Sequence, residues 1–316
     1  MFRIKRYTPD DRGAWDTFVS RSKNGTFLFL RPYMDYHSDR FADHSLLFYD
    51  EHGLFALLPA NQEGKTLYSH QGLTYGGLIV DDRGTVEAVC ALFDEMNTYL
   101  REQHIDHVVY KAIPWIYHRQ PSEEDLYALT TVCHARLSVR HISTTIALTQ
   151  PLHWRRDHRY GANKAASSGI VVERSDDFDG FWQVLTNNLR SKYGAMPVHT
   201  AAEMKLLHQR FPGQIALYVA RKEGNLLGGT VLYMCGEVIH AQYISASAEG
   251  KHLHAVDLLF RHILASPPSA AHFFDFGKSS DGDGRALNST LASQKEGFGG
   301  RGICYDWYEW DTVPKK

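Results

Sequence analysis

The chain has 316 residues, and its 34 basic and 36 acidic side chains give a formal net charge of −2. Hydrophobic residues make up 43% of the chain, which is enough for buried cores and excludes a disordered or fibrous protein. The near-neutral charge argues against a general nucleic-acid-binding protein, although a local basic patch could still bind one, and the length allows one large domain or two of about 150 residues.

Cysteine and histidine patterns exclude several kinds of site. The four cysteines, at positions 90, 133, 235 and 304, form neither a zinc or redox motif nor a disulfide framework. The pairs His104/His107 and His252/His254 do not complete a ligand set, so we expect no metal site. Because no apolar run approaches the roughly 20 residues of a membrane helix and no signal-peptide pattern is seen, we expect a cytoplasmic protein without membrane insertion.

In the first half of the chain, the residue pattern predicts a helix, a hairpin, a strand, a second helix and a second strand, in that order. Asp10 and Asp11 are typical of a helix start, and Trp15 and Phe18 lie on the apolar face that follows. Apolar residues with helical spacing predict the second helix at 85–102. The hairpin is expected at 46–58, and the strands at 66–69 and 107–113.

The second half repeats this order about 165 residues later. Asp176 and Asp177 precede a helix, and the other elements are expected at 216–232 (hairpin), 238–244 (strand), 253–264 (helix) and 271–276 (strand). The order predicts a mixed α/β protein with mostly antiparallel strands, not an alternating parallel series. We therefore predict two domains, at 1–150 and 151–316.

The linking segments predict further elements. A strand at 139–149 closes the first half, a basic helix follows within 151–168, and a strand at 169–174 opens the second half. Thr200 and Glu203 form a capping-box pattern at the start of a helix over 199–210. Glycine, serine and aspartate crowd residues 277–289, which we expect to be a flexible loop.

Two stretches carry a family resemblance. ISTTIALTQPLHWRRDHRYGANKAASSGIVVE resembles the segment of FemABX-type aminoacyl (peptidyl) transferases where the first domain ends. DFGKSSDGDGRALNSTLASQKEGFGG resembles their C-terminal signature, matched here by Asp275, Phe276, Gly277, Leu291, Lys295, Phe298, Gly299 and Gly300. The resemblance implies two tandem GNAT-like (acyl-CoA N-acyltransferase) domains, each a mixed, mostly antiparallel sheet flanked by helices, with the signature in the C-terminal domain.

The resemblance also implies transfer of an acyl or aminoacyl group to an amine through a tetrahedral oxyanion. It implies no tightly bound cofactor. The co-substrate would be an acyl-CoA or an aminoacyl-tRNA, and the acceptor a small-molecule amine or a cell-wall precursor. Lys295 matches the signature lysine, which implies a catalytic role in stabilising the oxyanion. The alternative is a solvated lysine on the C-terminal helix.

Substrate-binding candidates come from their positions in such a fold and not from a motif, and the stretch around Arg31 and Tyr36 does not keep the family's pattern. Each also has a structural interpretation: favourable charges at a helix end, ordinary sheet residues, or an aromatic-rich core edge. The candidates are Arg190, Lys192 and Tyr193 at the end of a helix, Gln242 and Tyr243 on the strand where GNAT-like folds place the donor carbonyl, Arg31 and Tyr36 in the first half, and Asp275 of the signature.

The sequence is also compatible with other functions. An acetyl-CoA-dependent N-acetyltransferase acting on an amino sugar or small amine is one, but the expected pyrophosphate-binding turn at 245–255 contains a single glycine, Gly250. A non-catalytic binding protein on a decayed transferase scaffold is another. The basic segment at 155–164 is interpreted either as a contact for phosphate or tRNA or as a solvated helix face.

Overall fold

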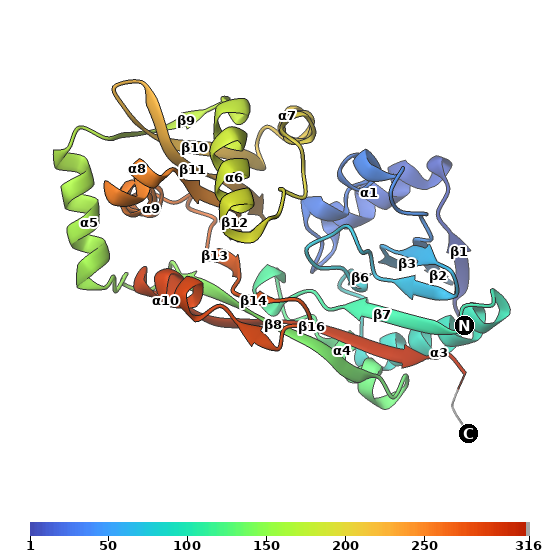
Figure 1. The fold of residues 1–316 in the computed structure, drawn as a ribbon. Coiled ribbons are helices and arrows are strands. Elements are labelled where there is room, and N and C mark those ends of the chain that lie inside the picture. Colours follow the sequence, from blue (N-terminus) through green and yellow to red (C-terminus); the bar gives the residue numbers. More distant parts are fainter. Residues whose placement is uncertain (314–316) are drawn as a thin grey trace. The chain divides into compact units, whose positions relative to one another are not determined.

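The computed structural model describes residues 1–313 and divides into two compact units (Figure 1). Unit 1 contains Met1–Ile142, Ser280–Leu287 and the chain from Ile303 onward, and unit 2 contains Ser143–Ser279 and Asn288–Gly302. The main division lies a few residues before the boundary expected near 150. The assignment of 1–150 and 151–316 as the two domains stays a prediction.

Unit 1 contains two groups of paired strands. One is a four-stranded sheet with the order β1-β2-β3-β6, and the other runs β4-β5-β7-β16-β8. The strands are β1 (Arg3–Arg6), β2 (Leu46–Asp50), β3 (Gly53–Leu58), β4 (Asn61–Glu63), β5 (Thr66–Tyr68), β6 (Ile79–Val80), β7 (His107–Lys111), β8 (Arg136–Ala147) and β16 (Arg301–Asp311). The helices are α1 (Arg12–Arg21), α2 (Arg31–Met34), α3 (Val86–Glu102) and α4 (Glu124–Thr131).

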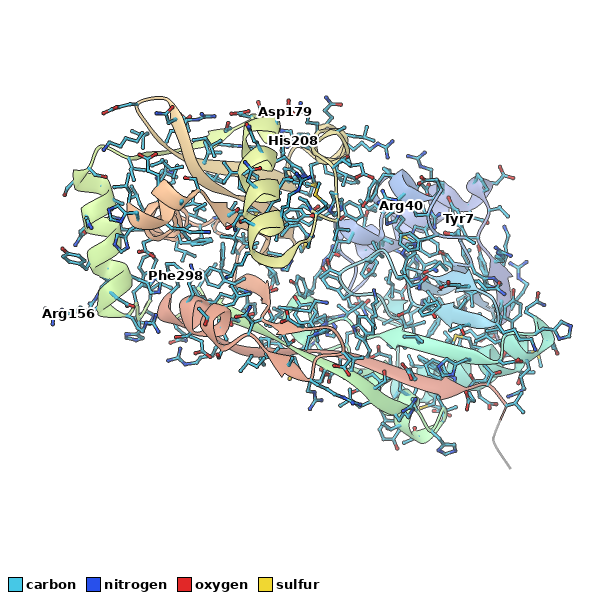
Figure 2. The ribbon with its side chains drawn as sticks, viewed as in Figure 1. Tyr7, Arg40, Arg156, Asp179, His208 and Phe298 are labelled. Atoms are coloured by element: carbon cyan, nitrogen blue, oxygen red, sulfur yellow. The ribbon has the colours of Figure 1, made fainter. Side chains whose placement is uncertain are left out.

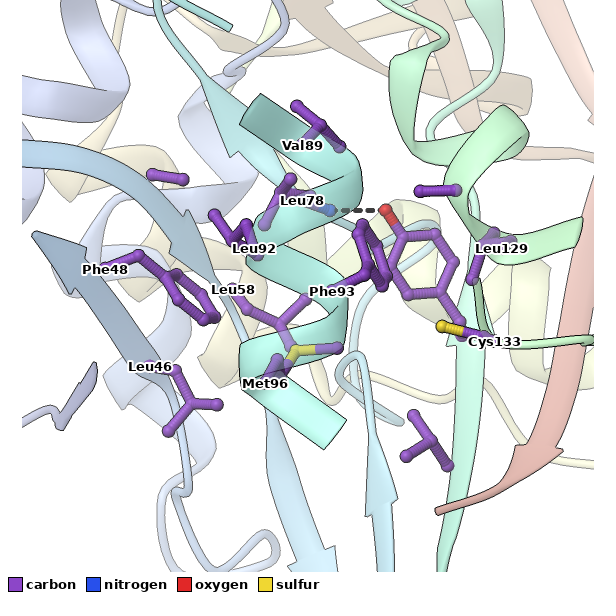
Figure 3. Close-up of a cluster of buried hydrophobic side chains, with 14 of the residues drawn as sticks. Leu46, Phe48, Leu58, Leu78, Val89, Leu92, Phe93, Met96, Leu129 and Cys133 are labelled. Carbon is purple, nitrogen blue, oxygen red and sulfur yellow. Dashed lines mark hydrogen bonds between the residues drawn. The ribbon is translucent and has the colours of Figure 1, made fainter. Parts of the chain in front are cut away.

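Helix α3 positions the core of unit 1. Thr85 caps it by accepting a hydrogen bond from the Ala88 N–H, and its apolar face is buried against β2 and β3 (Figure 3). Tyr110 of β7 lies in the same cluster and is fully buried. Its hydroxyl donates to Asp125 and accepts from the Leu78 N–H at 2.6 Å, so two other buried polar groups are satisfied by one side chain.

Unit 2 is built on the strand order β8-β13-β12-β11-β10-β9. The strands not yet given are β9 (Val171–Ser175), β10 (Ile215–Lys222), β11 (Asn225–Cys235), β12 (Val238–Ala246) and β13 (Phe273–Lys278). The helices are α5 (Arg156–Ser167), α6 (Phe178–Tyr193), α7 (Ala201–Arg210), α8 (Ala248–His252), α9 (Ala255–Ala265) and α10 (Ser289–Gly297). Neighbouring strands are antiparallel except β12 and β13, which run parallel.

Most expected elements are present. Both hairpins form, as β2–β3 and β10–β11, and the capping box of Thr200 and Glu203 starts α7. The flexible loop expected at 277–289 is wrong in part, because β14 (Ser280–Asp281) and β15 (Ala286–Leu287) pair there as a short hairpin. The last strand, β16, pairs with β7 and so lies in unit 1, although the sequence order suggested the second half.

Within residues 1–313, every helix is too short or too polar to cross a lipid bilayer.

Replacing Tyr110 with phenylalanine tests the buried contact that supports α3 and α4. We expect the free energy of unfolding to fall by about 1–3 kcal/mol, because the Leu78 N–H and the Asp125 carboxyl both lose a partner in a buried position. Chemical denaturation of both proteins measures the difference. The matched control is Tyr127→Phe at an exposed tyrosine of α4, which should change the free energy by less than about 0.5 kcal/mol. Equal effects of the two substitutions would contradict the interpretation.

Candidate active site in unit 2

Strands β12 and β13 separate within the sheet of unit 2. Their parallel register covers three residue pairs and ends at His240 and Asp275. Just beyond this point, β12 contains a β-bulge. Val231 pairs with Tyr243 and Leu232 with Ala241, which leaves Gln242 as the extra residue. A bulge bends its strand and redirects side chains, so Gln242 and Tyr243 lie where the strand leaves its neighbour.

Gln242 and Tyr243 differ in how well their polar atoms are satisfied. The Gln242 Oε1 atom is buried and accepts no hydrogen bond from the described residues. The Tyr243 hydroxyl lies 2.6 Å from His199 Nδ1 and accepts from the His199 N–H at 3.3 Å. Burial raises the pKa of Tyr243 to about 12, so the hydroxyl keeps its proton at neutral pH.

Trp182 of α6 fixes the position of His199. Its indole Nε1 donates to the His199 carbonyl at 2.8 Å, and its ring makes an edge contact with the Tyr243 ring at 5.1 Å. His199 directly precedes the capping box that starts α7, so both its backbone and its side chain are held. The sequence interpretation did not include His199, since nothing in its neighbours indicates a contact with a strand 44 residues away.

Asp275 has no exposed surface. Its carboxylate accepts hydrogen bonds from the Ser143 hydroxyl and from the Thr145 hydroxyl at 2.9 Å, and it lies 2.8 Å from His240 Nδ1. These partners come from β8 and β12, the two strands beside β13. In this structure the carboxylate therefore orients its neighbours, and the assignment of Asp275 to substrate binding stays a prediction.

Lys295 of α10 is buried, with 5% of its surface exposed. Its ammonium donates to the carbonyls of Gly277 and Lys278, both at 2.8 Å, and to the Ser279 hydroxyl at 3.0 Å. Burial lowers its pKa to about 8, and the charge of Asp275 opposes this shift. The alternative of a solvated surface lysine is therefore wrong, because Lys295 is buried and fastens α10 to the end of β13.

A pocket of about 680 Å³ lies among α5, α8, α9 and α10. Its lining includes Arg155, Lys251 and His254 as basic groups, Asp157 and Asp257 as acidic groups, and hydroxyl or amide groups at Ser289, Thr290, Ser293 and Gln294. Arg155 Nη1 donates to the Ser293 hydroxyl at 2.9 Å. The arrangement offers cations and hydrogen-bond donors to an anionic ligand.

A buried carboxylate holds two histidines on the wall of this pocket. Asp257 Oδ1 lies 2.6 Å from His158 Nδ1, and Oδ2 lies 3.1 Å from His254 Nδ1. Two glycines give these side chains room. A Cβ atom at Gly161 would lie under 3.0 Å from Asp257 Oδ2, and one at Gly297 would do the same with His158 Nε2. The expectation that no metal would be held stays open, although the described residues contain no group of three ligands placed for one.

The remaining candidates in unit 2 lie at the end of α6. Arg190 and Lys192 are exposed, and Gly194 ends the helix in the left-handed region, with φ at 61°. Arg190 contacts the Met196 sulfur at 3.7 Å. The side chain of Tyr193 lies outside the described residues.

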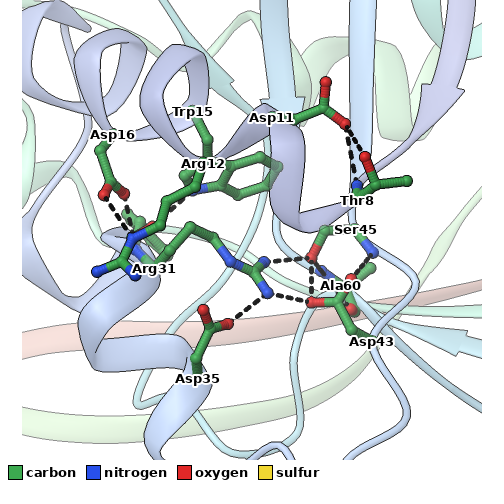
Figure 4. A network of polar contacts seen from close by, with 11 residues as sticks. Thr8, Asp11, Arg12, Trp15, Asp16, Arg31, Asp35, Asp43, Ser45 and Ala60 are labelled. Atoms are coloured by element: carbon green, nitrogen blue, oxygen red, sulfur yellow. Dashed lines mark hydrogen bonds and ion pairs between the residues drawn. The ribbon is translucent and has the colours of Figure 1, made fainter.

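Arg31 and Tyr36 lie in unit 1. Arg31 is 3% exposed, and its guanidinium pairs with Asp35 at 2.5 Å and Asp43 at 2.8 Å (Figure 4). It also lies over the Tyr7 ring at 3.7 Å. These contacts use Arg31 to join α2 to the chain before β2. Tyr36 is half-buried and stacks on the ring of His37, so their roles in substrate binding stay predictions.

Comparison with known proteins finds one matching sequence family and several similar structures. Residues 153–283 match the family described as acetyltransferase (GNAT) domain. The structure of FemX aligns with 98% of this chain and 97% of its own, at 12% identity and a TM-score of 0.68. L-PGS from Bacillus licheniformis aligns with 98% of this chain and 94% of its own, at 12% identity and a TM-score of 0.58.

A tandem GNAT protein from the clavulanic acid biosynthesis pathway aligns over the full length of both chains, at 9% identity and a TM-score of 0.54. No curated protein matches the chain in sequence. At these low identities, the similarities to the solved structures show the fold and not the substrates. They confirm the predicted resemblance in fold and the mixed α/β architecture of two tandem GNAT-like domains. Residues 153–283 are therefore a GNAT-type acyltransferase domain, and the chain as a whole has the tandem GNAT-like fold seen in FemX.

Proposed function

We propose that unit 2 transfers an aminoacyl group from an aminoacyl-tRNA to an amine, with the reaction at the bulge of β12. The observation that supports this proposal best is the bulge itself. There the buried Gln242 Oε1 atom accepts no hydrogen bond from the described residues, and β12 no longer pairs with β13. Such an acceptor suits the N–H of an attacking amine. A backbone that no longer pairs with a neighbour suits the donor carbonyl, as the GNAT-like fold implies.

The donor's phosphates would bind in the pocket beside α5. Five residues of chain lead from Gln242 to Ser247, roughly 17 Å of strand, and α8 then reaches the pocket at Gly250 and Lys251. A donor with its acyl group at the bulge therefore needs phosphates some distance from the carbonyl. Both CoA and the 3′ end of a tRNA meet this requirement.

The local geometry disfavours CoA at the start of α8. This helix has five residues, and the Ser247 hydroxyl already accepts from the Gly250 N–H at 3.0 Å. The Ser247 N–H donates in turn to the Leu227 carbonyl at 2.9 Å. Glu249 adds a carboxylate in the first turn, where it would repel a pyrophosphate.

Helix α5 favours a larger polyanion. Arg156, Arg159 and Lys164 are exposed, and within residues 1–313 none of them forms an ion pair. Tyr160 lies among them with 66% of its surface exposed. Figure 2 shows Arg156 at the start of α5. Exposed cations beside an aromatic ring suit the phosphates and unstacked bases of single-stranded RNA.

Lys295 would support the transition state. Its weakest contact is the neutral Ser279 hydroxyl at 3.0 Å, which a developing oxyanion would replace as the third acceptor of the ammonium. For the acceptor we propose an amine on an anionic cell-wall precursor, which the FemABX resemblance implies and which the exposed Arg190 and Lys192 would attract. Acetyl-CoA remains the second candidate donor, because the matching family is described as acetyltransferase.

Binding measurements separate the two donors. The double variant Arg156→Glu/Arg159→Glu should weaken the binding of uncharged tRNA at least tenfold, because two phosphate contacts become repulsive. Fluorescence anisotropy with labelled tRNA, and calorimetric titration with CoA, measure the two affinities. The control is Arg12→Glu, an exposed arginine of α1 in unit 1. Tight CoA binding without tRNA binding would replace the proposal with the acetyltransferase alternative.

Replacing Lys295 with methionine tests the catalytic role of the ammonium. We expect transfer to fall about 100- to 1,000-fold, because a preorganised donor to the oxyanion is lost. Single-turnover transfer from aminoacyl-tRNA is measured with a chain shown to be folded by circular dichroism. Lys295→Arg, which keeps the charge, should retain more activity than Lys295→Met. Unchanged turnover in the methionine variant would overturn the assignment.

The shifted pKa of Lys295 also predicts a pH dependence of stability. The folded state holds this lysine at a pKa of about 8, below the ordinary value of 10.5, so between these values the unfolded state binds more protons. Stability relative to Lys295→Met should therefore rise with pH across this range, by about 3 kcal/mol. Urea unfolding at pH 7.5 and pH 10 measures the difference. A constant difference between the two proteins would show that Lys295 titrates normally.

A further inference from the structure

We propose that Tyr243 and His199 form a proton relay that removes the proton from the attacking amine. In this relay, Tyr243 is the catalytic residue that touches the amine, and His199 acts through it. The inference rests on the proposed transfer at the bulge of β12, and it names the group that accepts the amine proton there.

The hydrogen bonds give the relay its direction. The Tyr243 oxygen accepts from the His199 backbone N–H, so its own proton is available to the second contact, His199 Nδ1 at 2.6 Å. In the relay, the Tyr243 hydroxyl donates in this contact, which corresponds to the neutral imidazole tautomer that carries its proton on Nε2. In that state, Nδ1 is a base joined by one short hydrogen bond to a hydroxyl at the reaction site.

The position of the pair suits the reaction. Tyr243 directly follows Gln242, whose unsatisfied Oε1 would accept one N–H of the amine. A second amine N–H would then reach the Tyr243 oxygen by replacing the Gln242 side-chain amide, which hydrogen-bonds that oxygen in the structure. His199 is 6% exposed, and Trp182 holds its carbonyl, so the imidazole does not have to reorganise during the reaction.

The proton transfers balance over one turnover. As the amine nitrogen bonds to the donor carbonyl carbon, its proton passes to the Tyr243 oxygen, and the Tyr243 proton passes to His199 Nδ1. The tetrahedral intermediate then collapses, and the bond between the carbonyl carbon and the ribose oxygen breaks. The imidazolium returns its proton through Tyr243 to that oxygen. The products are an amide and a free hydroxyl, and both residues regain their starting states.

The surrounding charges favour the transient imidazolium. Glu203 of α7 lies close enough to raise the pKa of Tyr243, although burial is the main cause of that shift. The same carboxylate accepts from the Thr200 N–H at 2.7 Å, next to His199 in the chain. The groups in contact with His199 include Tyr243 from β12 and Trp182 from α6, and neither of these two is charged.

Two variants test the relay while keeping its shape. Tyr243→Phe removes the hydroxyl. His199→Asn puts an amide oxygen near the position of Nδ1, which accepts the hydrogen bond but takes no proton. Each should lower kcat about 100-fold or more with little change in KM, as expected for loss of a general base. The double variant should lose no more than the worse single variant, because the residues act as one unit.

The pH profile and a control separate catalysis from structure. Wild-type kcat should fall on the acid side as His199 becomes protonated, and this limb should vanish in His199→Asn. The control Tyr218→Phe changes a half-buried tyrosine on β10 of the same unit and should keep full activity. Single variants within threefold of wild type, or additive losses in the double variant, would overturn the relay. Wild-type protein that transfers nothing would instead refute the proposed function.

Nitrogen-15 NMR of the histidine rings tests the relay without any substrate. The wild-type spectrum should show His199 with its proton on Nε2, and Tyr243→Phe should shift the Nδ1 resonance toward that of a free acceptor. A spectrum showing the proton on Nδ1 would overturn the proposal, because that nitrogen could then accept none.

Discussion

The Asp275 carboxylate, buried without exposed surface between two neighbouring strands, is the constraint on which the candidate site depends. A buried carboxylate is tolerated when hydrogen bonds replace its lost water, and here Ser143, Thr145 and His240 supply them. These partners hold β8 and β12 against β13 at the level where the parallel pairing ends. The strands separate only beyond this anchor, and the bulge at Gln242 directs the next side chains into the opening.

Lys295 extends the same anchoring to the end of β13. Its ammonium gathers three acceptors from Gly277, Lys278 and Ser279, so α10 is fastened to the segment that leaves the sheet. The signature lysine therefore has a structural task in addition to any chemical one. This explains why charge alone is an incomplete guide to its function. A cation that is already coordinated acts on a substrate by exchanging one of its partners.

The pocket beside α5 and the bulge of β12 would each bind a different part of a donor. The pocket offers cations and hydroxyls, and its walls depend on the close approach of α5, α9 and α10 around Asp257. Gly161 and Gly297 permit that approach, because a side chain at either position would displace a histidine or the carboxylate. The bulge offers an unsatisfied acceptor and a tyrosine–histidine pair. A donor that satisfies both has an acyl group at one end and phosphates at the other.

Sequence patterns by themselves determined most of the main elements and their order, although not the short hairpin of β14 and β15. Apolar spacing located α3 and α9, the capping box located the start of α7, and the signature around Lys295 indicated the fold. These features depend on residues close in the chain, where helical and strand periodicity act directly. Tertiary structure decided which side chains meet. His199 reaches Tyr243, His158 reaches Asp257, and β16 pairs with β7, all across long stretches of chain. Local spacing carries no information on such contacts, because burial and strand pairing select them only after the chain has folded.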